Sequence, residues 1–114
     1  MRVLFLGDIM GRSGRQAVIE NLPKLRTMGR YDLIVVNGEN ATSGAGLNAD
    51  HAEIILQAGA DCITLGDHAF DQKDMLSFIE KEPRVIRPLN FAKNAPGRGM
   101  YIASDARGRK LLIT

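Results

Sequence analysis

Three short apolar runs, each closed by small and acidic or amide residues, constrain the fold of this chain more than any other feature. The runs cover residues 3–6, 33–36 and 62–65, and their spacing of about thirty residues is the length of one strand–helix–strand unit. Each run ends at a glycine or asparagine, followed at once by polar side chains. Because glycine permits a sharp turn, the pattern predicts strands that deliver polar groups at their carboxyl ends.

The segment after the first run predicts a helix. Ser13 and Gln16 have the spacing of a capping box, in which each side chain satisfies a free backbone donor. We therefore expect the helix to open at Ser13. Pro23 lacks a backbone donor and clashes with the preceding turn, so it predicts a kink or a fresh short helix over residues 23–28.

Two further helices are expected between the later runs. Asn48 is a favoured N-cap and predicts a helix over residues 49–58. A third helix ends at about Lys81, and either Asp71 or Asp74 is expected to cap its start. Between the second run and the second helix, residues 41–46 are small and glycine-rich, which predicts a mobile loop.

The carboxyl-terminal part predicts a short strand at residues 85–86 and a hairpin. Residues 100–103 and 110–113 flank a turn at residues 105–108. The order of elements predicts an α/β layered fold with a mainly parallel sheet and right-handed crossovers. The run at residues 3–6 is apolar throughout, which suits a strand buried on both faces.

Composition places the chain among ordinary soluble proteins. It has 114 residues, 45% of them hydrophobic and 25% charged, which fits a single domain. The net charge is only +2, with basic residues scattered among carboxylates, so a nucleic-acid-binding face has little support. The lone Cys62 lies in an apolar run and predicts a buried small hydrophobe. No run has membrane-spanning length or the form of a signal peptide, and we expect a cytoplasmic protein.

The last residues, 111–114, read as the middle of a strand. We therefore expect residues 1–114 to be the amino-terminal part of a longer domain. A half-sheet with an open apolar edge would tend to self-associate, which predicts a homo-oligomer.

Polar side chains follow all three apolar runs, at the sheet edge where ligands collect in such folds. They are Asp8, Glu39, Asn40, Asp67 and His68. Oxygen donors with one imidazole suit hard to borderline metal ions. Two metal ions bridged by a carboxylate would balance the negative charge and orient a phosphoryl oxygen.

Other interpretations of these residues stay open. Any one of the acids alone is more often a helix cap or turn former, and only the repetition at three strand ends favours a metal site. His68 could be a metal ligand, a general acid that protonates a leaving alkoxide, or a structural imidazole. His51 lies on the second helix and is expected to be solvated or capping, while Asp71 and Asp74 are expected to serve the helix start.

Several other catalytic motifs are absent from the sequence. Gly7, Gly11 and Gly14 lack the spacing of a dinucleotide fingerprint, and there is no phosphate-binding Gly-Lys-Ser/Thr loop. A haloacid-type phosphatase would carry a second Asp two residues after Asp8, where this chain has Met10. No serine lies in a nucleophile-elbow context.

Residues 1 to about 99 closely resemble the amino-terminal half of the YmdB-like metallophosphoesterases, a branch of the calcineurin-like superfamily. The matching stretches are Phe5–Arg12, Val36–Ala41, and Thr64–His68 continuing to Phe70 and Asp71. Together these stretches are specific, whereas the first alone would not be. The resemblance implies half of a calcineurin-like αββα fold.

The resemblance also implies an activity, a metal content and residue roles. The activity would be that of a two-metal phosphodiesterase, with iron or manganese, acting on substrates such as 2′,3′-cyclic nucleotides. Asp8 would bind one metal with help from Asn40, Glu39 would bridge both, and Asp67 would bind the second. His68 would assist the leaving group.

Two departures from the family pattern stand out. The family usually has Asn where this chain has Asp67, which adds a negative charge to the site. The family also completes its site with histidines from the carboxyl-terminal half, and this chain contains only His51 and His68.

Our hypothesis is that the intact protein is a metal-dependent phosphodiesterase and that this chain supplies half of its site, with little activity alone. One alternative is a non-catalytic α/β module that binds a nucleotide or a protein partner. Another is a folded remnant that assembles through its open sheet edge.

Overall fold

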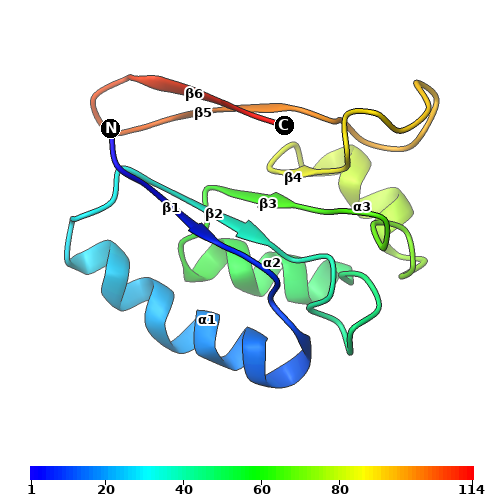
Figure 1. Ribbon diagram of the computed structural model, residues 1–114, viewed down its shortest axis with the longest axis horizontal. Coiled ribbons are helices and arrows are strands. Elements are labelled where there is room, and N and C mark those ends of the chain that lie inside the picture. Colours follow the sequence, from blue (N-terminus) through cyan, green and yellow to red (C-terminus); the bar gives the residue numbers. More distant parts are fainter.

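The computed structural model describes residues 1–114 and contains a four-stranded parallel sheet. The strands lie in the order β1 (Val3–Leu6), β2 (Leu33–Asn37), β3 (Cys62–Thr64) and β4 (Val85–Ile86) (Figure 1). Because all four are parallel, their carboxyl ends lie at one edge of the sheet. The predicted α/β class with a mainly parallel sheet is confirmed.

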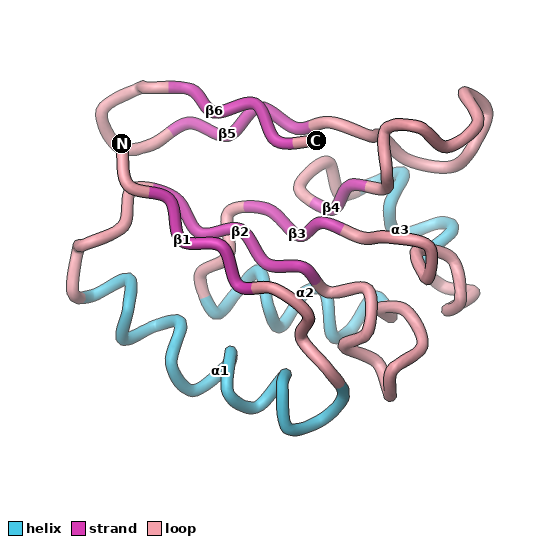
Figure 2. Tube along the Cα trace, viewed as in Figure 1, coloured by secondary structure: helices cyan, strands magenta, loops and turns pink.

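Helices and a hairpin cover opposite faces of this sheet. The helices are α1 (Gly11–Thr27), α2 (Ala49–Ala58) and α3 (Met75–Lys81), and α1 and α2 lie against one face. The antiparallel hairpin of β5 (Tyr101–Ser104) and β6 (Lys110–Ile113) lies over the other (Figure 2). The predicted carboxyl-terminal hairpin is therefore confirmed, and the molecule has three layers.

Alternation along β2 divides the core between these layers. Ile34 and Val36 belong to the large cluster that packs against the helices, whereas Leu33 and Val35 belong to a smaller cluster under the hairpin. This follows from the two-residue period of a strand. Cys62 lies in the smaller cluster, fully buried, and its burial raises the pKa of the thiol to about 12. The prediction of a buried small hydrophobe is confirmed.

The first strand differs from its prediction. β1 is an edge strand, with Val3 42% and Phe5 59% exposed, while Leu4 and Leu6 pack on the large cluster. Burial on both faces was therefore wrong. The hairpin does not close over β1, because a hollow lined by Val3, Phe5 and Leu112 separates β1 from β6.

Helix α1 also departs from the expectation. It begins at Gly11, and the predicted capping box is not formed, because Gln16 Nε2 donates to Glu20 Oε1 at 2.8 Å. The backbone N–H of Gly11 donates to the carbonyl of Asn40, which fixes the helix start two residues early. Pro23 lies inside α1, which continues to Thr27, so the fresh short helix was also wrong. Burial of Leu22 against the sheet favours continuation despite the missing donor.

The start of α2 agrees with its prediction, and the start of α3 does not. Asn48 Oδ1 accepts a hydrogen bond from the His51 backbone at 2.8 Å, as a cap should. Asp74 occupies the N-cap position of α3, but its side chain makes no capping bond there and accepts from the Ala49 backbone instead. None of the helices is both long and apolar enough to cross a membrane.

Candidate active site

The loops after β1, β2 and β3 are joined by backbone hydrogen bonds at the carboxyl edge of the sheet. Ile9 donates to the carbonyl of Asn37 at 3.2 Å. Gly38, in the next loop, donates to the carbonyl of Thr64 at 3.0 Å. These bonds bring together the three strand ends that carry the predicted site residues.

Asp8 and Asn40 are in direct contact across two of these loops. Asn40 Nδ2 donates to Asp8 Oδ1 at 3.0 Å. Asp8 itself has a φ of 48°, in the left-handed region that residues other than glycine seldom adopt. The loop thus holds an exposed carboxylate in an unfavourable backbone conformation, an arrangement that recurs at functional sites.

Glu39 has a buried carboxylate oxygen with no partner. Its Oε2 atom is buried and accepts no hydrogen bond in the structure. The carboxylate lies so close to Gly66 that a Cβ at that position would overlap both of its oxygens. A buried anionic oxygen is costly unless it is paired with a cation or a donor, so this atom is suited to a metal ion or a similar ligand.

His68 is held by a carboxylate that was assigned to another role. His68 Nδ1 lies 2.6 Å from Asp71 Oδ2, and both side chains are partly exposed. This hydrogen bond raises the pKa of His68, as do the negative charges of Asp67 and Glu39. The charged imidazole is therefore favoured, with its other nitrogen free of protein partners.

Asp71 is thus the residue that sequence reasoning placed wrongly. It was expected to serve the start of the third helix, but α3 begins only at Met75 and Asp71 binds His68. The signal was present, because Asp71 follows His68 by three residues inside a stretch that matches the family.

His51 does not cap α2, since Asn48 does so. His51 is half-buried, and its Nδ1 lies 2.7 Å from the hydroxyl of Thr42. Thr42 is itself buried, and its backbone donates to the carbonyl of Gly46 at 2.9 Å. The glycine-rich loop is a hydrogen-bonded turn joined to α2 through Thr42 and His51.

The fit of these residues to metal ions is partial. Asp8, Glu39, Asn40 and Asp67 offer the oxygen donors that hard and borderline cations prefer, and Asp67 is exposed without a hydrogen bond or ion pair of its own. The unpartnered Glu39 oxygen supports a cation beside it. In this structure no group of three or more His, Cys, Asp or Glu side chains is arranged to hold a metal ion.

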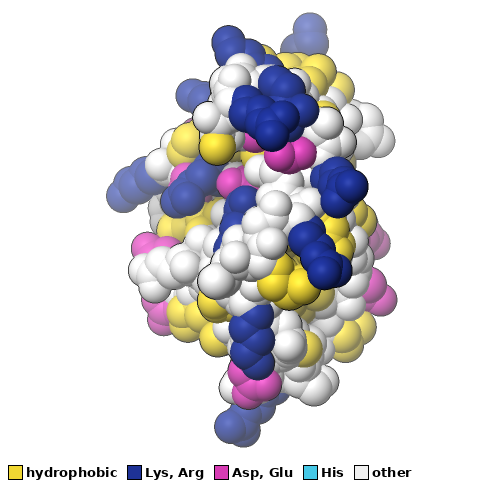
Figure 3. Space-filling model, turned by 90° about the vertical axis from the view of Figure 1, so that its left-hand side faces the viewer, with side chains coloured by type: hydrophobic (Ala, Val, Ile, Leu, Met, Phe, Trp, Pro, Cys, Tyr) yellow, Lys and Arg dark blue, Asp and Glu magenta, His cyan; other side chains and the backbone are white.

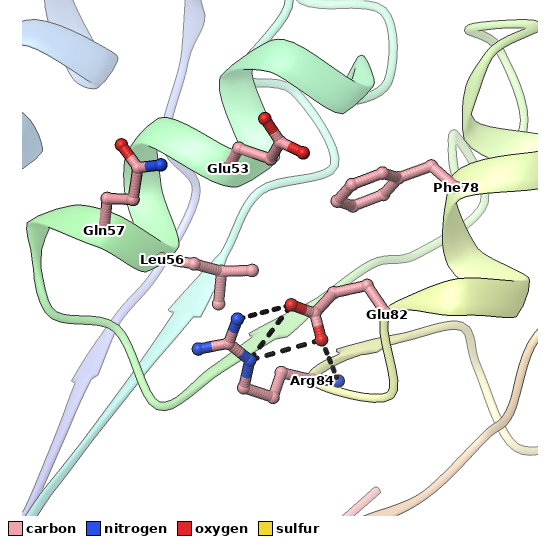
Figure 4. A pocket seen from close by; sticks show the side chains of 6 residues that line it. All are labelled: Glu53, Leu56, Gln57, Phe78, Glu82 and Arg84. Carbon is pink, nitrogen blue, oxygen red and sulfur yellow. Dashed lines mark hydrogen bonds and ion pairs between the residues drawn. The ribbon is translucent and has the colours of Figure 1, made fainter.

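A second hollow, between α2 and α3, has a different character. Its volume is about 290 Å³, and it contains Glu82 and Arg84, joined by several hydrogen bonds (Figure 4). These bonds lower the pKa of Glu82 and raise that of Arg84. The charges of Glu82 and Arg84 neutralise each other, and the pair lies away from the carboxyl ends of the strands. We therefore interpret it as a structural ion pair and not as part of a reactive centre.

Known proteins with similar sequences are phosphoesterases by name. The chain is 41% identical over 113 residues to a 2′,3′-cyclic-nucleotide 2′-phosphodiesterase of Bacillus subtilis, covering 99% of this chain and 42% of the relative. It is 40% identical over 118 residues to a putative phosphatase/phosphodiesterase of Mycoplasma genitalium, covering 100% and 42%. The chain therefore spans about two fifths of the length of these relatives.

Solved structures show the same fold. A hypothetical protein from Thermus thermophilus superimposes with a TM-score of 0.89 at 41% identity, over 98% of this chain and 43% of that one. A novel phosphatase of Mycoplasma pneumoniae gives 0.84 at 36% identity, over 98% and 41%. A family model described as YmdB-like protein matches residues 4–114. The chain belongs to the YmdB-like protein family.

Proposed function

We propose that the intact protein is a metal-dependent phosphodiesterase and that this chain supplies half of its site. The observation that carries the proposal is the buried, unpartnered oxygen of Glu39 at the meeting point of three strand ends. Relatives named as phosphodiesterase or phosphatase support a phosphate-ester substrate, and we propose 2′,3′-cyclic nucleotides as its class.

Four side chains would hold two transition metal ions, iron or manganese. Asp8 and Asn40 would hold the first, Glu39 would lie between the two, and Asp67 would hold the second. When bound, such ions polarise phosphoryl oxygens and lower the pKa of a coordinated water. Gly66 leaves the space that the Glu39 carboxylate needs in this arrangement.

His68 would act as the general acid. Its Nδ1 is held by Asp71, so the proton available to substrate is the one on Nε2. Hydrolysis adds the oxygen of water to phosphorus and breaks the bond from phosphorus to the leaving oxygen, which takes the proton from Nε2. The hydrogen bond to Asp71 raises the pKa of His68, which favours the protonated imidazole.

Turnover of bis(p-nitrophenyl) phosphate with added Mn²⁺ tests the proposal. We expect clear activity from a gene product of the relatives' length and little from the 114 residues alone. Equal activity from the short chain would contradict the half-site. If the longer product holds no stoichiometric transition metal and Asp8→Asn changes nothing, the metal-dependent function is wrong and the non-catalytic binding module is correct.

A further inference from the structure

A hollow between the first turns of α1 and α2 is not part of the candidate active site. Its volume is about 190 Å³, and the side chains that line it come from these two helices. They are Arg12, Arg15, Gln16 and Ile19 of α1 and His51 and Ile54 of α2. Two arginines, an imidazole and an amide line it without a single carboxylate, so the hollow is electropositive.

The two arginines are largely free to bind a ligand. Arg12 is exposed and makes no hydrogen bond or ion pair. Arg15 donates one bond, to the carbonyl of Ala41, and neither arginine has a carboxylate within 4 Å. Three acids lie outside the lining. Glu20 accepts from Gln16, Asp74 accepts from the Ala49 backbone, and Asp50 is exposed in the first turn of α2.

His51 adds a neutral donor to the same hollow. Thr42 Oγ1 accepts a hydrogen bond from the Asn48 backbone at 3.0 Å, so its hydroxyl proton is free for His51 Nδ1 at 2.7 Å. We therefore assign the ring proton to Nε2. Burial, and then the charge of Arg15, lower the pKa of His51, and the charges of Asp50 and Asp74 oppose this lowering. The net shift of the pKa is downward and favours this neutral form.

The backbone contributes in the same direction. Helices α1 and α2, of 17 and 10 residues, both begin beside the hollow, and helix N-termini carry partial positive charge. The volume is several times the roughly 30 Å³ that one water occupies, which is room for a tetrahedral anion. Guanidinium groups match the geometry of both phosphate and carboxylate oxygens. Of these two anions phosphate carries the larger negative charge near neutral pH, about −1.5 to −2, which suits a pair of arginines.

We infer that this hollow is a binding site for a phosphate group, carried either by inorganic phosphate or by a phosphate monoester. Arg12 and Arg15 bind its oxygens, and His51 donates from Nε2. Both Arg15 and His51 also contact residues 41 and 42, directly after Asn40. A bound phosphate would therefore act on the loop that carries Glu39 and Asn40.

Calorimetric titration of phosphate into the 114-residue chain, treated with chelator, tests this site separately from the proposed function. Without metal, phosphate cannot bind through the metal ligands. We expect saturable binding by one site and a loss of about tenfold in affinity for Arg12→Gln, since a charge-assisted bond is removed. The matched control is Arg98→Gln, an exposed arginine that lines none of the hollows, which should leave the affinity unchanged.

Arg15 requires a conservative substitution, because its side chain also donates a hydrogen bond to the carbonyl of Ala41. Arg15→Lys keeps the charge but loses the fork geometry, and it should weaken binding with the fold intact. Nuclear magnetic resonance adds a readout on the wild type, in which phosphate should shift the Arg12 side-chain N–H and the His51 ring signals but not the side-chain N–H signals of Arg98.

The same titration with adenosine 3′-monophosphate tests whether the site prefers a phosphate monoester to inorganic phosphate. The compound with the higher affinity shows which of the two the site binds. Absence of saturable binding for both would overturn the site. So would an equal loss of affinity in the Arg98→Gln control, or shifts spread over all arginines.

Discussion

The carboxylates at the two ends of the sheet differ in how many hydrogen bonds and ion pairs they make. At the amino ends of the strands, Asp32 accepts from the Arg2 backbone and pairs with Arg109 at 3.1 Å. Nearby, Asp105 accepts from the backbones of Arg107 and Arg109, both at 2.9 Å. Figure 3 shows this side of the molecule, with basic side chains beside acidic ones.

At the carboxyl ends the acids have few partners. Asp8 accepts one bond, from Asn40, and Glu39 Oε2 accepts none. Acids at the amino end make ion pairs and hydrogen bonds within the fold, and those at the carboxyl end are the residues of the proposed site.

Glu39→Gln should give the largest effect and the sharpest test of this division. We expect phosphodiesterase activity of the longer gene product to fall by about 10²-fold or more, because a charged group that stabilises the transition state is removed. The melting temperature of the metal-free protein should not fall, since Glu39 Oε2 has no bond to lose. A clear loss of stability with retained activity would show that Glu39 is structural.

Gly66→Ala should displace the Glu39 carboxylate while leaving Glu39 itself unchanged. The added Cβ would overlap the Glu39 oxygens and displace them, so Mn²⁺ affinity measured by calorimetry should drop by about tenfold or more, as when a supporting neighbour of a metal ligand is lost. Gly7→Ala is the matched control, because its Cβ would meet only Phe5 at 3.6 Å. Equal losses in both variants would contradict the close approach at Gly66.

Asp71→Asn should lower activity by about tenfold and shift its pH dependence. The hydrogen bond that His68 Nδ1 donates to Asp71 is the largest cause of the raised pKa of His68. A general acid works in its protonated form, so activity is lost as pH rises through the pKa of His68. Removing the charge of Asp71 lowers that pKa and should move the loss to lower pH.

The rate of turnover against pH measures this shift. Asp74→Asn is the control, because Asp74 contacts the Ala49 backbone and not His68. An unchanged profile in Asp71→Asn would remove His68 from the proton transfer.

At the amino end the expected effect is on stability alone. Burial would raise the pKa of Asp105, but hydrogen bonds from Arg109 and Arg107 lower it below 3.8, and the Arg2 backbone lowers that of Asp32. A lowered pKa contributes stability that is complete above the ordinary value and is lost as pH falls through the folded-state value. Asp105→Asn should therefore reduce thermal stability at pH 7 more than at pH 3, by calorimetry, with activity unchanged near neutral pH.

The sequence predicted the helices, strands and turns that are determined by residues close together in the chain. The period of the apolar runs was enough for the parallel sheet, the Asn48 side chain for the start of α2, and the order of elements for the hairpin. The convergence of Asp8, Glu39 and Asn40 followed from a general property of parallel sheets.

What the sequence could not predict depends on contacts between distant residues. Exposure of Val3 and Phe5 depends on how far the hairpin reaches over β1. The start of α1 depends on a bond from Gly11 to Asn40. Basic residues that are scattered along the chain, such as Arg2, Arg30 and Arg107, line one hollow because the fold brings their segments together.

The left-handed backbone of Asp8 limits how this position can vary. Besides glycine, asparagine and aspartate are the residues that tolerate such a conformation best. Among the substitutions of a saturation library, the fold should accept Gly and Asn at position 8 more readily than Glu, although Glu would preserve the charge. Very few amino acids both tolerate this backbone conformation and carry a carboxylate. We therefore expect few substitutions of Asp8 to preserve both the fold and the proposed role.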